Sequence, residues 1–357
     1  MNKRIIWNPE ILTTDKLIDV SNMRKTFIDD SLRRSLEVDY YEWKLVNNVF
    51  LKGKMWAVYD KQKVIGMASF TPKKFKVCSE IIIASEIGDT FTDPNYQRKG
   101  IFSVLVNSVR KDALNNSRVK LLYGTPNEKS LPGYEKKLNF HQIPSTQVAN
   151  YIYPITINKV VNARFGKKWK KNIINILLQF FYKVLFRQNK SSHNISLSEV
   201  ENFPKDIYSL LKSHTDQYDI IMVRDYNYLR WRFLSNPDKY SIWIVYKIEE
   251  IIGYIVTKTG EWKGLKVLYI ADYLMKENND VYFHDAILRL IKKIKNNGID
   301  LLSCWAVKSD IYAKELRSCR FLKIKDIPII CYSNKFGKQV IKTNYKWHFT
   351  MADSDNI

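Results

Sequence analysis

The sequence of 357 residues predicts an α/β (α+β) fold built from two related units. Three observations support this prediction. Short apolar runs of β-strand type alternate with amphipathic helical patterns, and the same order of patterns occurs twice along the chain. Finally, 45% of the residues are hydrophobic, which at this length is enough for two domains with cores of their own.

The first unit shows its elements through hydrophobic periodicity and turn residues. Helices are expected at 11–29 and 40–49, strands at 55–60, 64–72 and 81–92, a helix at 101–114, a strand at 119–125 and a helix at 127–138. Residues 139–155 read as extended segments that close the unit.

The second unit repeats the sequence of the first as well as its order. The matched segments are 39–45 with 225–233, 55–66 with 242–253, and 87–92 with 270–275. Asp89 and Asp272 fall in corresponding places. Such self-similarity indicates two copies of one unit of about 130 residues. We therefore expect an N-terminal domain at 1–155 and a C-terminal domain at 199–357, joined by a connector at 156–198.

A turn that leads into a helix in the first unit predicts an anion site. In GDTFTDPNYQRKGIF (88–102), a Pro-Asn turn precedes Gly100, which opens the helix 101–114. The unpaired N–H groups of a helix N-terminus and the positive end of its dipole favour a bound phosphate. The corresponding segment 276–280 reads KENND, with two acids and no glycine. We therefore expect one anion site in each chain, in the N-terminal half.

Positive charge is concentrated in the connector. The chain has a net charge of +22, and eleven Lys or Arg but no Asp or Glu lie between Glu135 and Glu199. The basic run KKWKK (167–171) precedes the largely apolar NIINILLQFFYKVLF (172–186). This pattern indicates an amphipathic helix packed on the protein itself, a peripheral membrane contact through 160–187, or a subunit contact. A monomer and a dimer both stay open.

Several functional classes find no support in the sequence. The four cysteines form no CxxC pair and the five histidines form no HExxH motif, so neither a metal site nor a disulfide framework is expected. A bilayer-spanning apolar run and a signal peptide are missing, which favours a cytoplasmic protein. No RNA- or DNA-reading motif accompanies the basic residues, so nucleic acid is not expected as a partner.

The anion-site segment resembles motif A of the GNAT superfamily of acyl-CoA-dependent N-acyltransferases, written Q/R-x-x-G-x-G/A. The residues that carry the resemblance are QRKGIF (97–102), with DPNY (93–96) as the usual lead-in, while Asn127, Ser130 and Tyr134 resemble motif B. The resemblance implies two tandem GNAT-like domains, the second one degenerate. Each would be a mixed, mostly antiparallel sheet flanked by helices, with the basic helical segment between them. Phe102 departs from the small residue that the motif has at this place.

This resemblance also implies roles for individual residues, with acyl-CoA as co-substrate and no metal. The expected acyl-CoA contacts are Phe91, Thr92, Gln97, Arg98, Lys99, Gly100, Ile101, Phe102, Ser103, Asn127 and Ser130. Amides from Arg98 to Ser103 would hold the pyrophosphate, and the backbone at Phe91 and Thr92 would pair with the pantetheine arm. Tyr134 would donate a proton to the leaving CoA thiolate.

The base that accepts the proton of the attacking amine is left open among four residues. Glu86 has the spacing of the general-base glutamate in the histone-acetyltransferase branch, eleven residues before Gln97. Asp89 is a second candidate, and His348 or Asp353 near the C-terminus is a third. Residues three apart on a regular strand face opposite sides of the sheet. Glu86 and Asp89 would share a side only at a β-bulge, which Gly88 permits.

A narrower resemblance concerns the acceptor. The paired tryptophan-containing helices, the basic connector and the WHFTMADSD ending (347–355) resemble tandem-GNAT enzymes that N-acylate dTDP-linked 3-amino-3,6-dideoxyhexoses for surface polysaccharides. This resemblance implies a nucleotide-sugar acceptor bound between the units. Acyl or aminoacyl transfer to a peptide or another small amine is the alternative enzyme, and a basic membrane- or nucleic-acid-binding protein is the alternative without catalysis.

Overall fold

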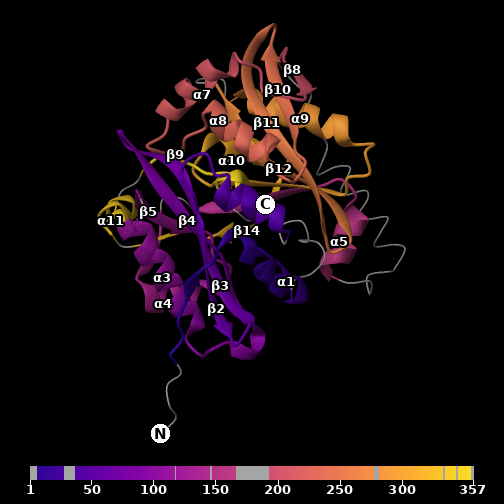
Figure 1. Cartoon of the computed structure of the whole chain (residues 1–357). Coiled ribbons are helices and arrows are strands. Elements are labelled where there is room, and N and C mark those ends of the chain that lie inside the picture. The colour runs from indigo at the N-terminus through magenta and orange to yellow at the C-terminus, as the bar shows by residue number, and fades with distance from the viewer. Residues whose placement is uncertain are drawn as a thin grey trace.

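The computed structural model shows two twisted sheets flanked by helices (Figure 1). The residues that the structure describes are 6–27, 37–116, 118–144, 147–165, 193–276, 281–332, 334–342 and 345–354. The fold class expected from the sequence is confirmed: within these residues each unit contains a mixed, mostly antiparallel sheet, as in tandem GNAT-like domains.

The first sheet runs in the order β1-β2-β3-β4-β5-β15-β6, and it is extended by β9, which pairs with β3, and by β16, which pairs with β9. Its strands are β1 (Glu10–Ile11), β2 (Lys54–Asp60), β3 (Lys63–Val77), β4 (Glu80–Thr92), β5 (Val119–Gly124), β6 (Phe140–Gln142), β9 (Ile220–Met222), β15 (Ile330–Tyr332) and β16 (Trp347–His348). β4 and β5 are parallel, and the described neighbours are otherwise antiparallel except β16 and β9.

The second sheet runs in the order β14-β7-β13-β12-β11-β10-β8. Its strands are β7 (Val148–Pro154), β8 (Ser196–Val200), β10 (Ser241–Lys247), β11 (Glu250–Trp262), β12 (Leu265–Met275), β13 (Leu301–Val307) and β14 (Leu322–Ile327). The parallel pair β12 and β13 corresponds to β4 and β5 of the first sheet, as the sequence repeat predicts.

Helices cover both sheets. They are α1 (Leu17–Phe27), α2 (Val38–Tyr41), α3 (Ile101–Asn116), α4 (Leu131–Leu138), α5 (Ile157–Phe165), α7 (Ile207–Asp216), α8 (Tyr226–Leu229), α9 (Val281–Ile294), α10 (Ile311–Ser318) and α11 (Lys335–Lys342). α2 and α8 each continue into a five-residue π-helical turn, Glu42–Val46 and Arg230–Leu234. Several elements were not expected from the sequence. They include a strand at Glu10–Ile11, the helices α7 and α11, the strands β9 and β15, and a 3-10 turn at Met351–Asp353.

The two sheets exchange strands, so they do not divide at the boundaries expected from the sequence. β7, which belongs to the expected N-terminal domain 1–155, lies between β13 and β14 of the second sheet. In return, β15 from the expected C-terminal domain 199–357 lies between β5 and β6 of the first sheet. A repeat in sequence relates equivalent positions but carries no information on which sheet edge a strand joins. The exchange fixes the two units against each other.

A shared hydrophobic core also fixes the two units against each other. One cluster of buried apolar side chains contains Tyr41 and Phe75 from the first unit together with Tyr228 and Ile244 from the second. Burying such side chains contributes roughly 1.5–3 kcal/mol each. The units are therefore packed as one body around a common interior.

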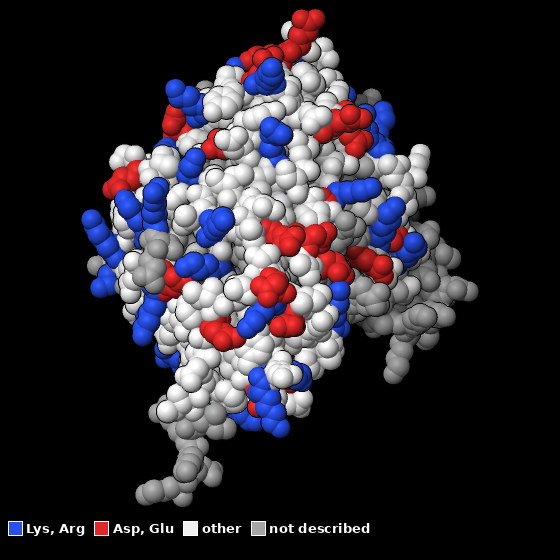
Figure 2. Space-filling view, viewed as in Figure 1, with Lys and Arg blue, Asp and Glu red and all other residues white. Residues whose placement is uncertain are grey.

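Most of the charged connector lies outside the described residues. Its described start is α5, where Val160 packs against Leu265, Val267 and Leu301 of the second unit. The expected membrane contact at 160–187 lies largely outside the described part. Figure 2 shows Lys and Arg side chains gathered along the flank that carries α11 and α3. No helix within the described residues is long and apolar enough to cross a membrane.

Candidate active site

A β-bulge brings two carboxylates into one pocket. Ser69 of β3 pairs with Gly88 and Met67 pairs with Phe91, so β4 has two residues opposite one. Asp89, one of the two, adopts a left-handed backbone with φ +47°. Because the bulge interrupts the alternation of the strand, Glu86 and Asp89 both line a pocket of about 840 Å³. The bulge expected from the sequence is confirmed, with the unusual backbone angle at Asp89 and not at the preceding glycine.

Glu86 is a buried carboxylate with partners on both oxygens. Its Oε2 lies 2.7 Å from the ammonium of Lys73, which is equally buried. Its Oε1 accepts from the hydroxyls of Thr125 (3.2 Å) and Ser354 (3.1 Å). Hydrogen bonds and a cation of this kind stabilise the ionised form of the carboxylate. Ser354 thereby brings the end of the described chain beside the pocket.

Asp89 is held in a second ion-pair network. Its Oδ2 lies 2.6 Å from the ammonium of Lys44 and accepts from the Ser69 hydroxyl at 2.7 Å. Its Oδ1 lies 3.1 Å from the guanidinium of Arg24, which also lines the pocket. Asp272, the counterpart in the second unit, is likewise paired with a buried cation, Arg224. The shared feature is thus an acidic residue at a bulge with a buried cation beside it.

The expected anion-binding turn has two residues with left-handed backbones. Arg98 has φ +63° and Gly100 has φ +88°. A Cβ on Gly100 would meet nothing within 4 Å, so only the backbone conformation calls for glycine there. Gln97, Arg98 and Lys99 are exposed, whereas Ile101 is buried at the start of α3. Exposed N–H groups at this helix start could hold a phosphate.

Phe102 packs against the residues that line the pocket. Its ring lies edge-on to Tyr134, with centroids 5.1 Å apart. A Cβ on Gly133 would come within 2.8 Å of the same ring. The large side chain at 102 is therefore accommodated because position 133 has none. This pairing accounts for the departure from the small residue of the motif.

Tyr134 points its hydroxyl to the pocket from a buried position. The hydroxyl lies 2.8 Å from that of Thr90, the second bulge residue. Burial raises the pKa of Tyr134, although the hydrogen bond with Thr90 acts to lower it. The phenol therefore stays protonated at neutral pH, as a proton donor must.

Asn127 and Ser130 line the pocket and also shape the turn before α4. The Asn127 side-chain oxygen accepts from the backbone N–H groups of Lys129 and Ser130, each at 3.0 Å. The turn replaces the first helical residues expected at 127–130, because the asparagine side chain competes for these N–H groups. Phe91 lines the pocket as well. Thr92 and Ser103 lie near it in sequence but not on its wall.

The second unit supplies the opposite wall of the pocket. This wall consists of Trp305, Lys325, Asp326, Ile327 and Pro328 from the ends of β13 and β14. The pocket therefore lies between the two units. Sequence reasoning missed all of these residues, yet the repeat held a signal, because the runs LLYGT (121–125) and LLSCW (301–305) align Trp305 with Thr125.

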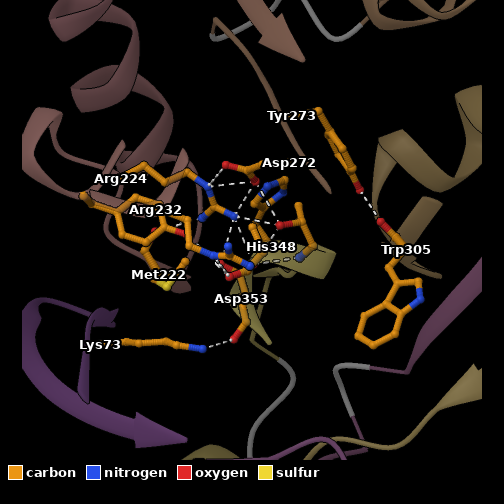
Figure 3. A network of polar contacts seen from close by, with 12 residues as sticks. Lys73, Met222, Arg224, Arg232, Asp272, Tyr273, Trp305, His348 and Asp353 are labelled. Carbon is orange, nitrogen blue, oxygen red and sulfur yellow. Dashed lines mark hydrogen bonds and ion pairs between the residues drawn. The ribbon is translucent and has the colours of Figure 1, made fainter. Parts of the chain in front are cut away.

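Asp353 lies in a buried network away from the pocket wall (Figure 3). Arg224 joins its carboxylate (3.0 Å) to that of Asp272 (2.9 Å). Burial raises the pKa of Asp353, with Arg224 opposing the shift. The backbone oxygen of Asp353 accepts from Lys73 at 3.0 Å. This network ties the 3-10 turn of the chain end to the Lys73–Glu86 pair.

His348 is also remote from the pocket wall. It is buried among the rings of His214, Tyr218, Tyr273 and Tyr312, at 5.1–5.5 Å between centroids. Burial lowers the pKa of His348 well below its ordinary value, so the ring is neutral at pH 7. The structure thus brings Glu86, Asp89 and Tyr134 together and leaves Asp353 and His348 outside that group.

Two further observations concern an anion site in the second unit and a metal site. The counterpart of the anion turn, 277–280, lies outside the described residues. No cluster of three or more metal-ligating side chains occurs in the described ranges.

The Lys73, Thr125 and Ser354 side chains around Glu86 were not foreseen from the sequence, since they lie 13, 39 and 268 positions from Glu86.

Comparison with known proteins agrees with this geometry. Residues 20–140, which include the bulge and the anion turn, match the sequence model of the Acetyltransferase (GNAT) family. No curated protein matched the sequence. The match supports the class of the protein, an enzyme that transfers acyl groups from acyl-CoA to an amine, and it covers the first unit only.

Solved structures of similar fold extend over nearly the whole chain. Saccharomyces cerevisiae N-myristoyltransferase with bound myristoyl-CoA has a TM-score of 0.62 at 13% identity, covering 97% of this chain and 86% of that one. A probable N-acyltransferase from Enterococcus faecalis V583 has a TM-score of 0.59 at 12% identity, covering 92% and 72%. A GCN5-related N-acetyltransferase from Anabaena variabilis has 0.58 at 12%, covering 91% and 72%. At these identities the likeness concerns the fold.

Proposed function

We propose that the protein transfers an acyl group from acyl-CoA to the amino group of a dTDP-linked amino-deoxy sugar, in the synthesis of a surface polysaccharide. The acyl group would be acetyl or a short hydroxyacyl such as 3-hydroxybutanoyl. The observation that carries the proposal is the pocket between the units, with Glu86, Asp89 and Tyr134 on the family-matched side and a wall from the second unit opposite.

The donor would approach along the anion turn. Backbone N–H groups from Arg98 to Ser103, at the start of α3, are suited to the pyrophosphate of CoA. Beyond the bulge, Phe91 and Thr92 still pair with β3, whereas the parallel pairing of β4 with β5 ends at Glu86. The pantetheine arm could therefore pair with the other edge of β4 at Phe91 and Thr92. The thioester would then lie near Tyr134, which lines the same pocket.

In the reaction, the neutral amine attacks the thioester carbonyl. The C–N bond forms, the C–S bond breaks, the amine loses one proton and the CoA thiolate gains one. Tyr134 is placed to give the thiolate its proton because burial keeps the phenol protonated. Four carboxylates line the pocket, and of these Glu86 and Asp89 are the ones proposed to take up the proton of the amine, each with a cation already beside it.

A peptide amine is the second candidate acceptor. The observation that favours it is the whole-length likeness in fold to the S. cerevisiae N-myristoyltransferase, a protein described with bound myristoyl-CoA. The pocket volume of about 840 Å³ is compatible with either acceptor.

The two candidate acceptors, a dTDP-linked amino sugar and a peptide amine, can be distinguished by testing each acyl-CoA donor with each kind of acceptor. The full chain would be incubated with acyl-CoAs from acetyl to myristoyl, each with dTDP-3-amino-3,6-dideoxyhexoses, glycine-initiated peptides and simple amines. CoA thiol release and product mass are measured. The proposal expects fastest release with a short acyl-CoA and a dTDP-amino sugar. Turnover confined to peptides would replace it with the second candidate, and a failure to bind any acyl-CoA would overturn both.

A further inference from the structure

A row of side chains crosses three strands on the pocket side of the second sheet. Asn150 of β7 pairs directly with Trp305 of β13 on one side and with Lys325 of β14 on the other. Residues directly opposite one another in neighbouring strands point to the same face of a sheet. Trp305 and Lys325 both line the pocket, so this is the face that the row presents to it.

A second bulge places Lys325 in this row. Lys323 pairs with Tyr151 and Lys325 pairs with Asn150, so β14 has one residue more than β7 between these two pairs. On a regular strand, Lys323 and Lys325 would point to the same face. The bulge turns them to opposite faces, and Lys323 forms an ion pair with Asp326 at 2.9 Å. One lysine therefore faces the pocket and its near neighbour does not.

The row combines three kinds of contact. Trp305 is half-buried, with its backbone oxygen fixed by the Tyr273 hydroxyl at 2.8 Å, so its strand is held in place (Figure 3). The Asn150 side-chain oxygen accepts from Ser303 at 2.8 Å, which orients the amide. Lys325 is exposed and positively charged. An indole face, an amide and an ammonium in line suit a ligand with a flat ring and an anionic group beside it.

We propose that Trp305 and Lys325, which Asn150 separates in the sheet, form the binding site for the nucleoside diphosphate part of the acceptor. The base stacks on Trp305 and a phosphate oxygen pairs with Lys325, which leaves the sugar amine directed to the carboxylates of the opposite wall. The inference rests on the proposed function, and it names the residues that would select a nucleotide-linked acceptor over a simple amine.

CoA also contains a nucleoside diphosphate, so the two sources must be told apart. The anion turn at 97–100 lies at the start of α3 in the first unit, whereas the row belongs to the second sheet. The donor and acceptor nucleotides would thus occupy separate sites, since residues 97–100 are not on the pocket wall that Trp305 and Lys325 line. This separation predicts that substitutions in the row change one affinity and not the other.

The test measures binding of dTDP and of CoA separately, by calorimetry on the full chain. Trp305→Ala is expected to weaken dTDP binding by about fivefold or more, as removal of a base-stacking aromatic does, and Trp305→Phe to restore most of it. Lys325→Gln is expected to weaken dTDP binding and to reduce its dependence on salt. Lys263→Gln, at an exposed position in the turn between β11 and β12 and not on the pocket wall, is the charge-matched control and should leave dTDP binding unchanged.

The inference is overturned if the wild-type protein does not bind dTDP at millimolar concentration, or if Lys263→Gln weakens dTDP binding as much as Lys325→Gln. It is equally overturned if the row variants weaken CoA instead. Thermal unfolding of each variant identifies loss of fold, and Lys325→Gln, at an exposed position, remains informative if Trp305→Ala unfolds. If the proposed function is wrong, the outcome of the experiment is different: dTDP binds, but no acyl-CoA is consumed with any amino sugar.

Discussion

Trp43 and Trp231 exchange hydrogen bonds across the contact between the two units. Each indole N–H donates to the backbone oxygen of the other residue, at 2.8 and 3.1 Å, and the rings stack with centroids 4.8 Å apart. The same separation of 188 residues relates Asn48 to Asn236, whose side chains both donate to the backbone of their own π-helical turn. A reciprocal contact of this kind is expected at an approximate two-fold axis between equivalent units.

Removing one indole N–H should weaken the contact between the units. Trp43→Phe keeps an aromatic ring but takes away the donor to the buried Trp231 oxygen, which costs about 1–3 kcal/mol of unfolding free energy. Trp43→Ala also removes the stacking and should cost roughly 3–5 kcal/mol. Urea unfolding measures both. Trp262→Phe, at a position 38% exposed, is the control, and an equal effect there would contradict the role of the pair.

Gly100 offers a test of the anion turn that separates strain from binding. Gly100 and Gly264 both have left-handed backbones, φ +88° and +76°, and neither would bring a Cβ within 4 Å of another atom. Valine at either place should therefore cost a similar 1–3 kcal/mol of stability from backbone strain alone. Only Gly100→Val should also weaken CoA binding, because it distorts the start of α3. Equal CoA affinity of the two variants would argue against a pyrophosphate site at this turn.

Tyr134→Phe should slow the reaction with little effect on donor binding. Removal of a general acid typically lowers the rate by roughly 10²-fold or more, while the KM for acyl-CoA should change less than about twofold. Tyr332→Phe is the matched control, since Tyr332 packs in the same core cluster and accepts from Arg110. An acyl thioester with a more acidic thiol should restore the rate of Tyr134→Phe. If it does not, the hydroxyl does not protonate the thiolate.

The parts of this site that were predictable share a local cause. The anion turn, the strand and helix order and the bulge before it follow from residues near one another in sequence, such as Gly88, Asp89 and Gly100. Helical and strand periodicity and turn chemistry are local signals. The correspondence of Asp89 with Asp272 also holds, because each is paired with a buried cation.

The parts that were missed depend on contacts between distant residues. Ser354 hydrogen bonds to Glu86 across 268 positions, and Lys73 to the Asp353 backbone across 280. The segment with Asp353 and Ser354 follows β16, which pairs with β9, and β9 joins the first sheet beside β3. Strands of two or three residues such as these carry no signal for their partner. Trp305 and Lys325 face the pocket only because β7 lies between their strands.

The roles of Glu86 and Asp89 can be distinguished by removing the charge of Glu86 together with that of its partner and comparing the result with Asp89→Asn. Glu86→Gln removes the carboxylate that neutralises the buried Lys73 ammonium and should destabilise the protein by about 3–5 kcal/mol. The double change Glu86→Gln with Lys73→Met should restore much of this loss. Acyl transfer in a single turnover is then measured on the double variant.

If Glu86 takes up the amine proton, the stable double variant stays slow with a protonated acceptor and recovers as pH is raised above the pKa of the amine. Asp89→Asn serves as the comparison, because Asp89 is also paired with buried cations. Recovery by Asp89→Asn alone would transfer the role to Asp89. Full activity of the Glu86 double variant at neutral pH would remove Glu86 from the reaction.

Asp310 should make the stability of the protein fall as pH rises from 4 to 7. Burial raises the pKa of Asp310 to about 6, although hydrogen bonds from Tyr218 and the Ile311 N–H oppose the shift. The folded state then binds more protons than the unfolded chain between about pH 4 and 6, so its stability decreases through that range. The full penalty above pH 6 is up to about 3 kcal/mol. Asp310→Asn resembles the protonated acid, so the variant should not lose unfolding free energy in this way as pH rises. In urea unfolding from pH 4 to 7, the unfolding free energy of Asp310→Asn should increase relative to that of the wild type as pH rises. Asp300 is the control of opposite sign: burial acts to raise its pKa, but the hydrogen bond from Lys159 and other donors lower it overall. Its effect lies below about pH 4, so a scan extended to about pH 2 should show the stability of Asp300→Asn falling relative to the wild type as pH rises toward about 4, with little further change above that. A pH-independent difference for Asp310→Asn would contradict the raised pKa.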